Sequence, residues 1–277
     1  MAGIDDMAFV SATTFLVTCP SHGYIELYGF DDPAVSHSNG PTSKGIFELP
    51  MLQPGCSYSY LHANFYPVVG HPHMLNPISS LERPLFYPSQ EDRICAVHIP
   101  LQSDFGHPIK STLLIHSRVF FELDPCVSAS SEESQPRPWD AWGPQNTRWY
   151  PTDWSGWRYA SYGLKVIDTA GQGSDLDSDD VAEVSDRRLR LRDFNPYALA
   201  TSISDDDEAL EAWQKGRVVT ESSWIPAGGF FKCNVESRLP YREVMTEELF
   251  DLTEVIMDEN HIVLLKVVLL PFPRQFE

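Results

Sequence analysis

Short runs of β-branched and aromatic residues recur along the whole chain and constrain its fold more than any other feature. Within each run, apolar and polar residues alternate over much of the length, and Pro, Gly or Asp stands at the end. This pattern predicts half-buried antiparallel strands. The expected strands are 15–19, 23–30, 45–50, 57–65, 93–100, 111–123, 162–168, 187–194, 217–221, 228–235, 239–244, 254–258 and 261–270.

A helical period occurs only over residues 203–214, where an acidic first turn is followed by Ala, Leu and Trp at helical spacing. The strands fall into irregularly spaced groups without βαβ alternation, and the chain contains 22 prolines. The sequence therefore predicts an all-β fold of antiparallel strand groups. We expect a partial β-propeller-like or stacked-sheet architecture with one short helix.

Two stretches, 128–138 and 169–186, are rich in Ser, Gly and acidic residues and have few apolar side chains to bury. They predict mobile loops. We expect a single β-rich domain over residues 1–277, in which strand groups 1–127 and 139–277 are joined by the Ser/Glu/Pro-rich linker 128–138.

The chain is strongly acidic, with a formal net charge of −19 and a pI near 4.7. Such a chain repels phosphate backbones and anionic lipids, so nucleic acid and membranes are not expected partners. Asp5 and Asp6 stand where a secretory signal would carry basic charge, and the longest apolar run, 261–272, is too short to span a membrane. Five cysteines without a CxxC pair predict free thiols and a cytoplasmic or nuclear location.

The sequence holds no recognisable catalytic or metal-binding motif. Alternate aspartates in 175–179 resemble a calcium-binding EF-hand loop, but Asp180 stands where the sharp turn needs glycine. His71 and His73 lie in a Pro-rich loop, and two histidines alone do not form a metal site. We therefore expect no catalytic residue, no metal and no cofactor, and a protein that is not an enzyme.

Residues 139–163, "WDAWGPQNTRWYPTDWSGWRYASYG", hold five of the seven tryptophans. The candidate residues, for partner binding or for structure, are Trp139, Trp142, Arg148, Trp149, Trp154 and Trp157. The rings can stack on a ligand such as a sugar, or they can be buried between neighbouring sheets. Because the chain is acidic, burial is favoured over stacking on the bases of a nucleic acid. Gly143-Pro144 predicts a turn. We expect the Arg148 guanidinium to stack on Trp142 or Trp149 and to bind backbone carbonyls.

Several sequence blocks also carry a family resemblance. "SATTFLVTCPSHGYIELYGFDD", "WDAWGPQNTRWY" and "RVVTESSWIPAGGFFKCNVESRLPYREV" follow one another in this order. Together they resemble the C-terminal region of basidiomycete (Agaricomycete) F-box proteins and their F-box-lacking relatives. The resemblance implies a β-propeller-like recognition region, related to ubiquitin ligases. In that family an N-terminal F-box binds a Skp-type adaptor. This chain begins at a strand without an F-box, which argues against adaptor binding.

Two functions follow from these patterns. The first is a non-catalytic protein-interaction module that resembles the substrate-recognition region of fungal F-box proteins. The alternative is a lectin-like or small-molecule-binding protein that uses a Trp-rich surface. A sugar site needs an exposed Trp beside Asp, Asn or Arg, whereas a structural role needs the same rings buried.

Overall fold

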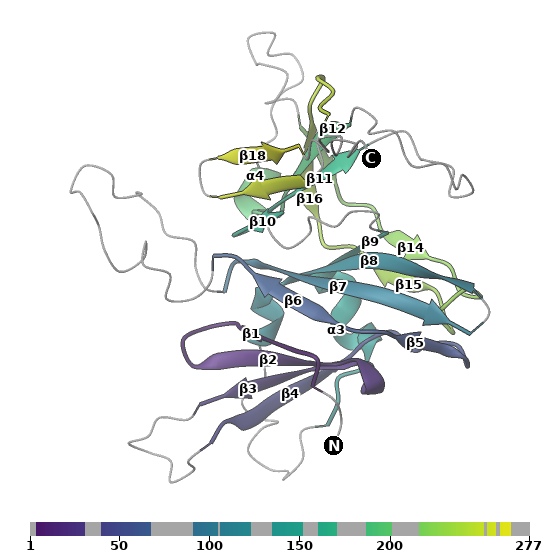
Figure 1. The fold of residues 1–277 in the computed structure, drawn as a ribbon. Coiled ribbons are helices and arrows are strands. Elements are labelled where there is room, and N and C mark those ends of the chain that lie inside the picture. The colour runs from purple at the N-terminus through teal and green to yellow at the C-terminus, as the bar shows by residue number, and fades with distance from the viewer. Residues whose placement is uncertain are drawn as a thin grey trace, which may run out of the picture.

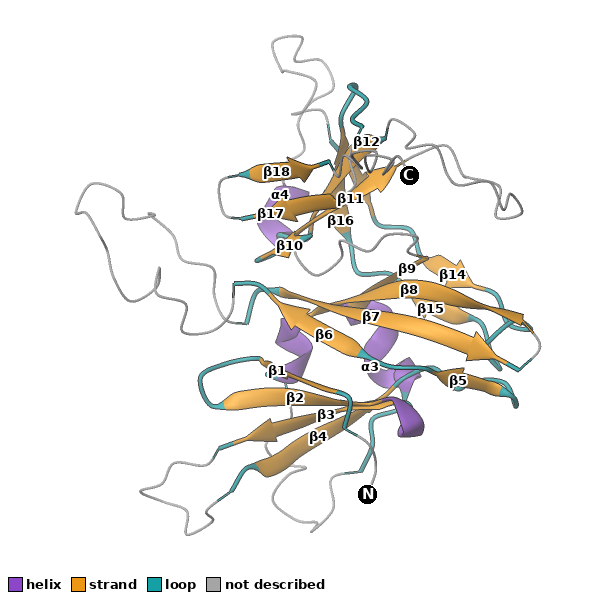
Figure 2. Ribbon diagram, in the orientation of Figure 1, coloured by secondary structure: helices purple, strands orange, loops and turns teal. Residues whose placement is uncertain are grey.

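The computed structural model describes residues 4–30, 40–67, 91–104, 106–122, 135–151, 160–170, 187–200, 216–251, 254–258 and 261–266. These residues form three antiparallel sheets of four or five strands and two two-stranded ribbons (Figure 2). The three larger sheets are stacked as layers (Figure 1). The predicted all-β class is therefore confirmed, with stacked sheets as its form.

Sheet 1 is a four-stranded antiparallel meander built from the N-terminal residues. Its strands, in order, are β1 (Asp6–Phe9), β2 (Thr14–Cys19), β3 (Tyr24–Gly29) and β4 (Thr42–Glu48). The 3-10 helix η1 (Pro20–His22) leads from β2 into β3. Gly23 follows η1 with a φ of 66°, a left-handed conformation that favours glycine.

Sheet 2 lies over sheet 1 and occupies the middle of the stack (Figure 1). Its strands are β5 (Cys56–Tyr58), β6 (His62–Phe65), β7 (Ile94–Ser103), β8 (Gly106–His116) and β9 (Thr147–Pro151); β5 and β6 both pair with β7. Residues 94–101 of β7 are all buried, because both faces of this strand are covered. Strand β9 follows the predicted linker 128–138, so the two expected strand groups share this sheet.

Sheet 3 and two ribbons complete the stack. Sheet 3 has the order β10 (Ser161–Tyr162), β11 (Lys165–Ala170), β12 (Arg188–Asp193), β16 (Tyr241–Met245) and β13 (Arg217–Val219). The ribbons are β14 (Ser223–Ile225) with β15 (Val235–Ser237), and β17 (Glu254–Met257) with β18 (Ile262–Leu265). The described α-helices are α3 (Trp139–Asn146) and α4 (Pro196–Ala200).

Three clusters of buried apolar side chains separate these layers. The first lies between sheets 1 and 2 and includes Leu16, Phe47 and Val97; the second lies between sheets 2 and 3 and includes Ile94 and Val166; the third lies between sheet 3 and the β17–β18 ribbon and includes Ile167 and Val255. Neighbouring residues of β7 belong to different clusters because successive side chains of a strand point to opposite faces.

Sheets 1 and 2 are also joined by two acidic side chains at their edge. The Leu61 amide donates to Oδ2 of Asp5 at 2.6 Å, and the Ala63 amide donates to Oδ2 of Asp6 at 3.0 Å. The His62 ring lies 3.3 Å from the same Asp6 oxygen. The two N-terminal aspartates thus supply acceptors for an amide of β6 and for the amide directly before this strand, which stabilises the contact between the layers.

Some predicted boundaries were wrong. The predicted strand 111–123 ends at residue 116, and the chain continues as the 3-10 helix η2 (Ser117–Phe120). This helix places the Phe120 side chain in the core between sheets 1 and 2. Most of the predicted strand 228–235 consists of turns and bends, since Gly228 has a φ of 96° that a strand does not allow. The predicted helix 203–214 lies outside the described residues, as does most of both predicted loops.

The cysteine thiols are expected to differ sharply in reactivity. Cys19, Cys56, Cys95 and Cys233 are free, and Cys126 lies outside the described residues. Burial raises the pKa of the Cys95 thiol, whereas Cys233 is exposed. Mass-tag labelling of the native protein should therefore modify Cys233 first and Cys95 only on unfolding. The unfolded, unreduced chain should show all five thiols, and a count of one would contradict the prediction of free cysteines.

Candidate functional site

The first part of the tryptophan segment forms helix α3, so the predicted turn at Gly143-Pro144 is wrong. The Thr147 hydroxyl donates to the Gly143 carbonyl at 2.7 Å and satisfies an acceptor at the C-terminal end of the helix. A Cβ atom on Gly143 would lie 2.4 Å from the Trp139 ring, so glycine lets this ring pack against the helix backbone. Burial of the tryptophan rings thus stabilises a helix that Gly and Pro disfavour locally.

Three tryptophans of the segment form one buried aromatic cluster. The ring centroids of Trp139 and Trp142 are 5.1 Å apart, and those of Trp139 and Trp149 are 5.8 Å apart. Trp142 meets Phe47 of sheet 1 at 5.3 Å, and Trp149 meets Phe231 at 5.4 Å. All four pairs are edge-to-face contacts, which aromatic rings prefer. The cluster fills the core between sheets 1 and 2, where it is closed to a ligand.

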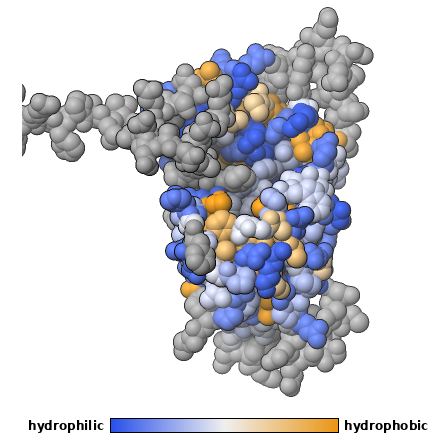
Figure 3. Space-filling model, turned by 90° about the vertical axis from the view of Figure 1, so that its right-hand side faces the viewer, coloured by the Kyte–Doolittle hydropathy of each residue, from blue (hydrophilic) through white to orange (hydrophobic). Residues whose placement is uncertain are grey.

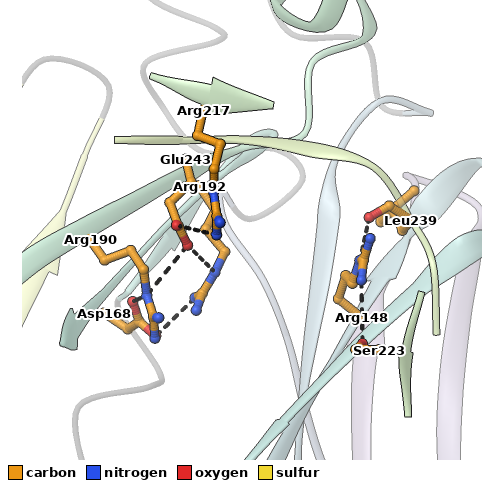
Figure 4. Close-up of polar contacts among 8 residues, drawn as sticks. All are labelled: Arg148, Asp168, Arg190, Arg192, Arg217, Ser223, Leu239 and Glu243. Atoms are coloured by element: carbon orange, nitrogen blue, oxygen red, sulfur yellow. Dashed lines mark hydrogen bonds and ion pairs between the residues drawn. The ribbon is translucent and has the colours of Figure 1, made fainter. Parts of the chain in front are cut away.

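Arg148 points to the opposite side of β9 from Trp149. Its Nε donates to the Leu239 carbonyl at 2.6 Å, and its Nη1 donates to the Ser223 hydroxyl at 3.3 Å (Figure 4). The same Nη1 also donates to the Ser237 carbonyl at 3.3 Å. The guanidinium carbon lies 5.3 Å from the centre of the Tyr241 ring. The expected bonds to backbone carbonyls are confirmed. The predicted stacking on Trp142 or Trp149 is wrong because adjacent residues of a strand face opposite layers.

The structure describes four of the six residues expected at the site. Trp154 and Trp157 lie outside the described residues. The other four, Trp139, Trp142, Arg148 and Trp149, are all buried. In its described part, the segment is a packed connection between the layers, and these four side chains are not open to a partner.

A charged network lies on sheet 3. Asp168 accepts two hydrogen bonds from Arg190, at 2.9 and 2.8 Å, and one from Arg192 at 2.8 Å (Figure 4). Glu243 forms an ion pair with Arg217 at 3.2 Å and lies within 4.0 Å of both other arginines. Each carboxylate is thereby matched by guanidinium groups.

This network fixes sheet 3 onto sheet 2. The buried Arg192 guanidinium lies 4.0 Å from the centre of the Tyr150 ring of β9, a cation–π distance. Asp168 and Glu243 are both bound by arginines, so neither carboxylate is an open general acid or base. The network therefore has a structural role.

The described residues offer no metal site: no three His, Cys, Asp or Glu side chains converge there. His71, His73 and the aspartates of 175–179 lie outside these residues. None of the helices in the described part of the chain has the length and apolarity to cross a membrane.

The outer face of sheet 1, which points away from sheet 2, carries a group of aromatic side chains. They are Phe9 of β1, Phe15 of β2, Tyr24 and Tyr28 of β3, and Phe30 directly after β3. Phe15 and Tyr28 stack at 5.5 Å with nearly parallel rings, and Phe9 and Phe30 lie 6.0 and 5.6 Å from Phe15. Phe9 is 41% exposed and Phe30 is 48% exposed. We call this surface the aromatic face.

One carboxylate lies within the aromatic face. Glu26 sits between Tyr24 and Tyr28 on β3, and the Ser43 hydroxyl donates to its Oε1 at 2.9 Å. Burial, a hydrogen bond to Glu26 and the charge of Glu26 raise the pKa of Tyr28 to about 12. Burial, followed by the same charge, raises the pKa of the Cys19 thiol. The aromatic face therefore presents aromatic rings around the Glu26 carboxylate.

The sequence contains a signal for the aromatic face, although the face is not among the predicted sites. In "GYIELYGF" the residues Tyr24, Glu26, Tyr28 and Phe30 alternate, which places them on one side of a strand. The same alternation predicted a half-buried strand, but it does not say which side meets the core.

No family model, no curated protein and no solved structure matches this chain.

Proposed function

We propose that this protein is a non-catalytic protein-interaction module whose contact surface is the aromatic face. The main observation in support of this proposal is that Phe9 and Phe30 are partly exposed beside the stacked rings of Phe15 and Tyr28. Aromatic side chains and methionine are enriched where proteins bind one another, and Met7 is exposed beside these rings on β1. The rings hold one another in place, so little side-chain entropy is lost when a partner binds.

The charge of the chain defines the class of partner. A net charge of −19 and Glu26 at the centre of the aromatic face favour a protein segment with both apolar and basic side chains. This role matches the family resemblance to the recognition region of fungal F-box proteins without the F-box. We also propose that this protein meets its protein partner in the cytoplasm or the nucleus.

The burial of the tryptophan cluster favours this function over a lectin-like one. A sugar site in the tryptophan segment would need an exposed Trp ring, whereas its described rings Trp139, Trp142 and Trp149 belong to the core. The aromatic face is instead made of Phe and Tyr side chains on the outer side of sheet 1, and such side chains are enriched where proteins bind one another.

Substitution of both exposed rings should abolish partner binding and leave the fold intact. In the variant F9S/F30S, we expect the amounts of specific partners retained from a fungal lysate to fall at least about tenfold, since central aromatic residues dominate interface affinity. Quantitative mass spectrometry of pull-downs measures this change. The matched control is Tyr197→Ser, an exposed ring on α4. Equal retention by F9S/F30S and wild type, with both folded in thermal melts, would refute the proposal.

A further inference from the structure

A pocket opens at the end of sheet 1 where β4 leaves the sheet. It has a volume of about 320 Å³ and lies between η1 and the chain that connects β4 to β5. Its walls include Pro20, His22, Glu48, Pro50, Met51 and Tyr58. This volume falls at the lower end of the range of about 300–1,000 Å³ for ligand pockets, which suits a single long side chain.

The pocket walls are held by hydrogen bonds, so the pocket is preformed. The Tyr58 hydroxyl donates to the Pro50 carbonyl at 2.6 Å, and the Leu49 amide donates to the Gly23 carbonyl at 2.8 Å. A Cβ atom on Gly23 would lie 3.2 Å from the Tyr58 ring, so glycine allows this ring to approach the backbone closely. A preformed pocket loses little entropy when a side chain enters it.

The pocket is continuous with the aromatic face. The His22 ring lies 5.3 Å from the Tyr24 ring, and Tyr24 is directly opposite Glu48 in the β3–β4 register. In Figures 1 and 2, η1 and β5 lie at the same end of the layers. Figure 3 views the molecule from this side and shows small apolar groups among hydrophilic residues. A partner segment that lies across the aromatic face therefore reaches this pocket, whose walls contain both apolar and polar side chains.

The chemistry of the pocket walls fits a cationic side chain. Glu48 is exposed and is the one carboxylate among the described lining residues, which include no Lys or Arg. Pro20, Pro50 and Tyr58 supply apolar surface for the methylene stem of such a side chain. Lys232 contacts the Met51 sulfur through its Nζ at 3.1 Å but is not a lining residue.

We propose that this pocket receives a lysine or arginine side chain of the partner segment that lies on the aromatic face. The inference rests on the proposed function and narrows it to a sequence pattern. Tyr24 lies next to the pocket, and Tyr28 belongs to the ring cluster. The two residues are four positions apart on β3, which corresponds to a distance of about 13 Å along the strand. An extended partner segment that lies along β3 would therefore carry its basic residue about four positions from an aromatic or aliphatic one.

Phage display of random dodecapeptides tests this pattern. On the wild-type protein, we expect selected peptides to carry Lys or Arg four positions from an apolar residue, with the basic residue enriched by up to about fivefold, the upper value for an exposed ion pair. Selection on Glu48→Gln should lose the basic enrichment and keep the apolar one. The control Glu248→Gln removes the same charge on the far side of the stack, after β16, and should keep both.

The outcomes separate the pocket from the aromatic face. Basic enrichment that survives Glu48→Gln overturns the pocket inference, and so does apolar enrichment on wild type without any basic residue. In both cases the proposed function stands if the variant F9S/F30S loses the apolar enrichment. Wild-type selections without any enriched pattern contradict both proposals.

Discussion

Replacing Trp142 with alanine is expected to lower the free energy of unfolding by about 3–5 kcal/mol, a large part of the stability of a domain. The Trp142 side chain is 2% exposed and fills the core between sheets 1 and 2. Its Nε1 donates to the Glu48 carbonyl at 2.9 Å, and its ring contacts Phe47 and Trp139 edge to face. Alanine would leave a cavity, a carbonyl without this donor, and two rings that each lose one aromatic partner.

Urea denaturation followed by fluorescence measures this loss. The matched control is Trp224→Ala, because Trp224 is 57% exposed on β14 and its removal should change stability by less than about 0.5 kcal/mol. Equal losses in the two variants would show that Trp142 does not hold the layers together. A stable Trp142→Ala variant that loses a partner would instead make the segment a binding surface.

Replacing Arg148 with methionine is expected to produce the second largest loss. Methionine keeps the apolar stem but removes the guanidinium donor of the Leu239 carbonyl and one of two side-chain donors of the Ser237 carbonyl, which also accepts from the Ser223 hydroxyl. Each buried carbonyl left unpaired costs about 1–3 kcal/mol of stability. Arg148→Lys should rescue little, since one ammonium group does not reproduce the planar set of guanidinium donors.

The matched control for Arg148 is Arg217→Met on sheet 3. The Arg217 side chain is 74% exposed, so the loss of its ion pair with Glu243 should cost less than about 1 kcal/mol. Chemical denaturation of both variants gives the comparison. An Arg148→Met variant as stable as Arg217→Met would contradict a structural role for the buried guanidinium.

The fold class follows from local pattern, and particular strands show why. In β3 the residues Ile25 and Leu27 alternate with Tyr24, Glu26 and Tyr28, and any layered β fold buries one of these two sets. The same reasoning located most other strands. It could not find β1, because "DMAF" is too short to show a period, and its pairing with β2 decides its conformation.

The candidate site divides in the same way. That the tryptophan segment packs against neighbouring sheets could be inferred from its composition, since large rings gain most from burial. That residues 139–146 form a helix could not, because Gly143 and Pro144 both disfavour one in isolation. The pocket beside η1 could not be predicted from the sequence either, since its walls come together only when β3 pairs with β4 and the connection to β5 folds beside η1.

The sequence by itself determined the acidic charge, the alternation of apolar residues and hence the all-β class, because these depend on residue type and on the period of a strand. Tertiary structure alone decided which layer each face meets. On β9, Trp149 joins the core toward sheet 1 and Arg148 meets Tyr241 of sheet 3, although the two residues are adjacent. The physical reason is that burial depends on every surface the chain brings together: sheet 2 is covered on both sides, whereas the outer face of sheet 1 keeps Phe9 and Phe30 partly exposed.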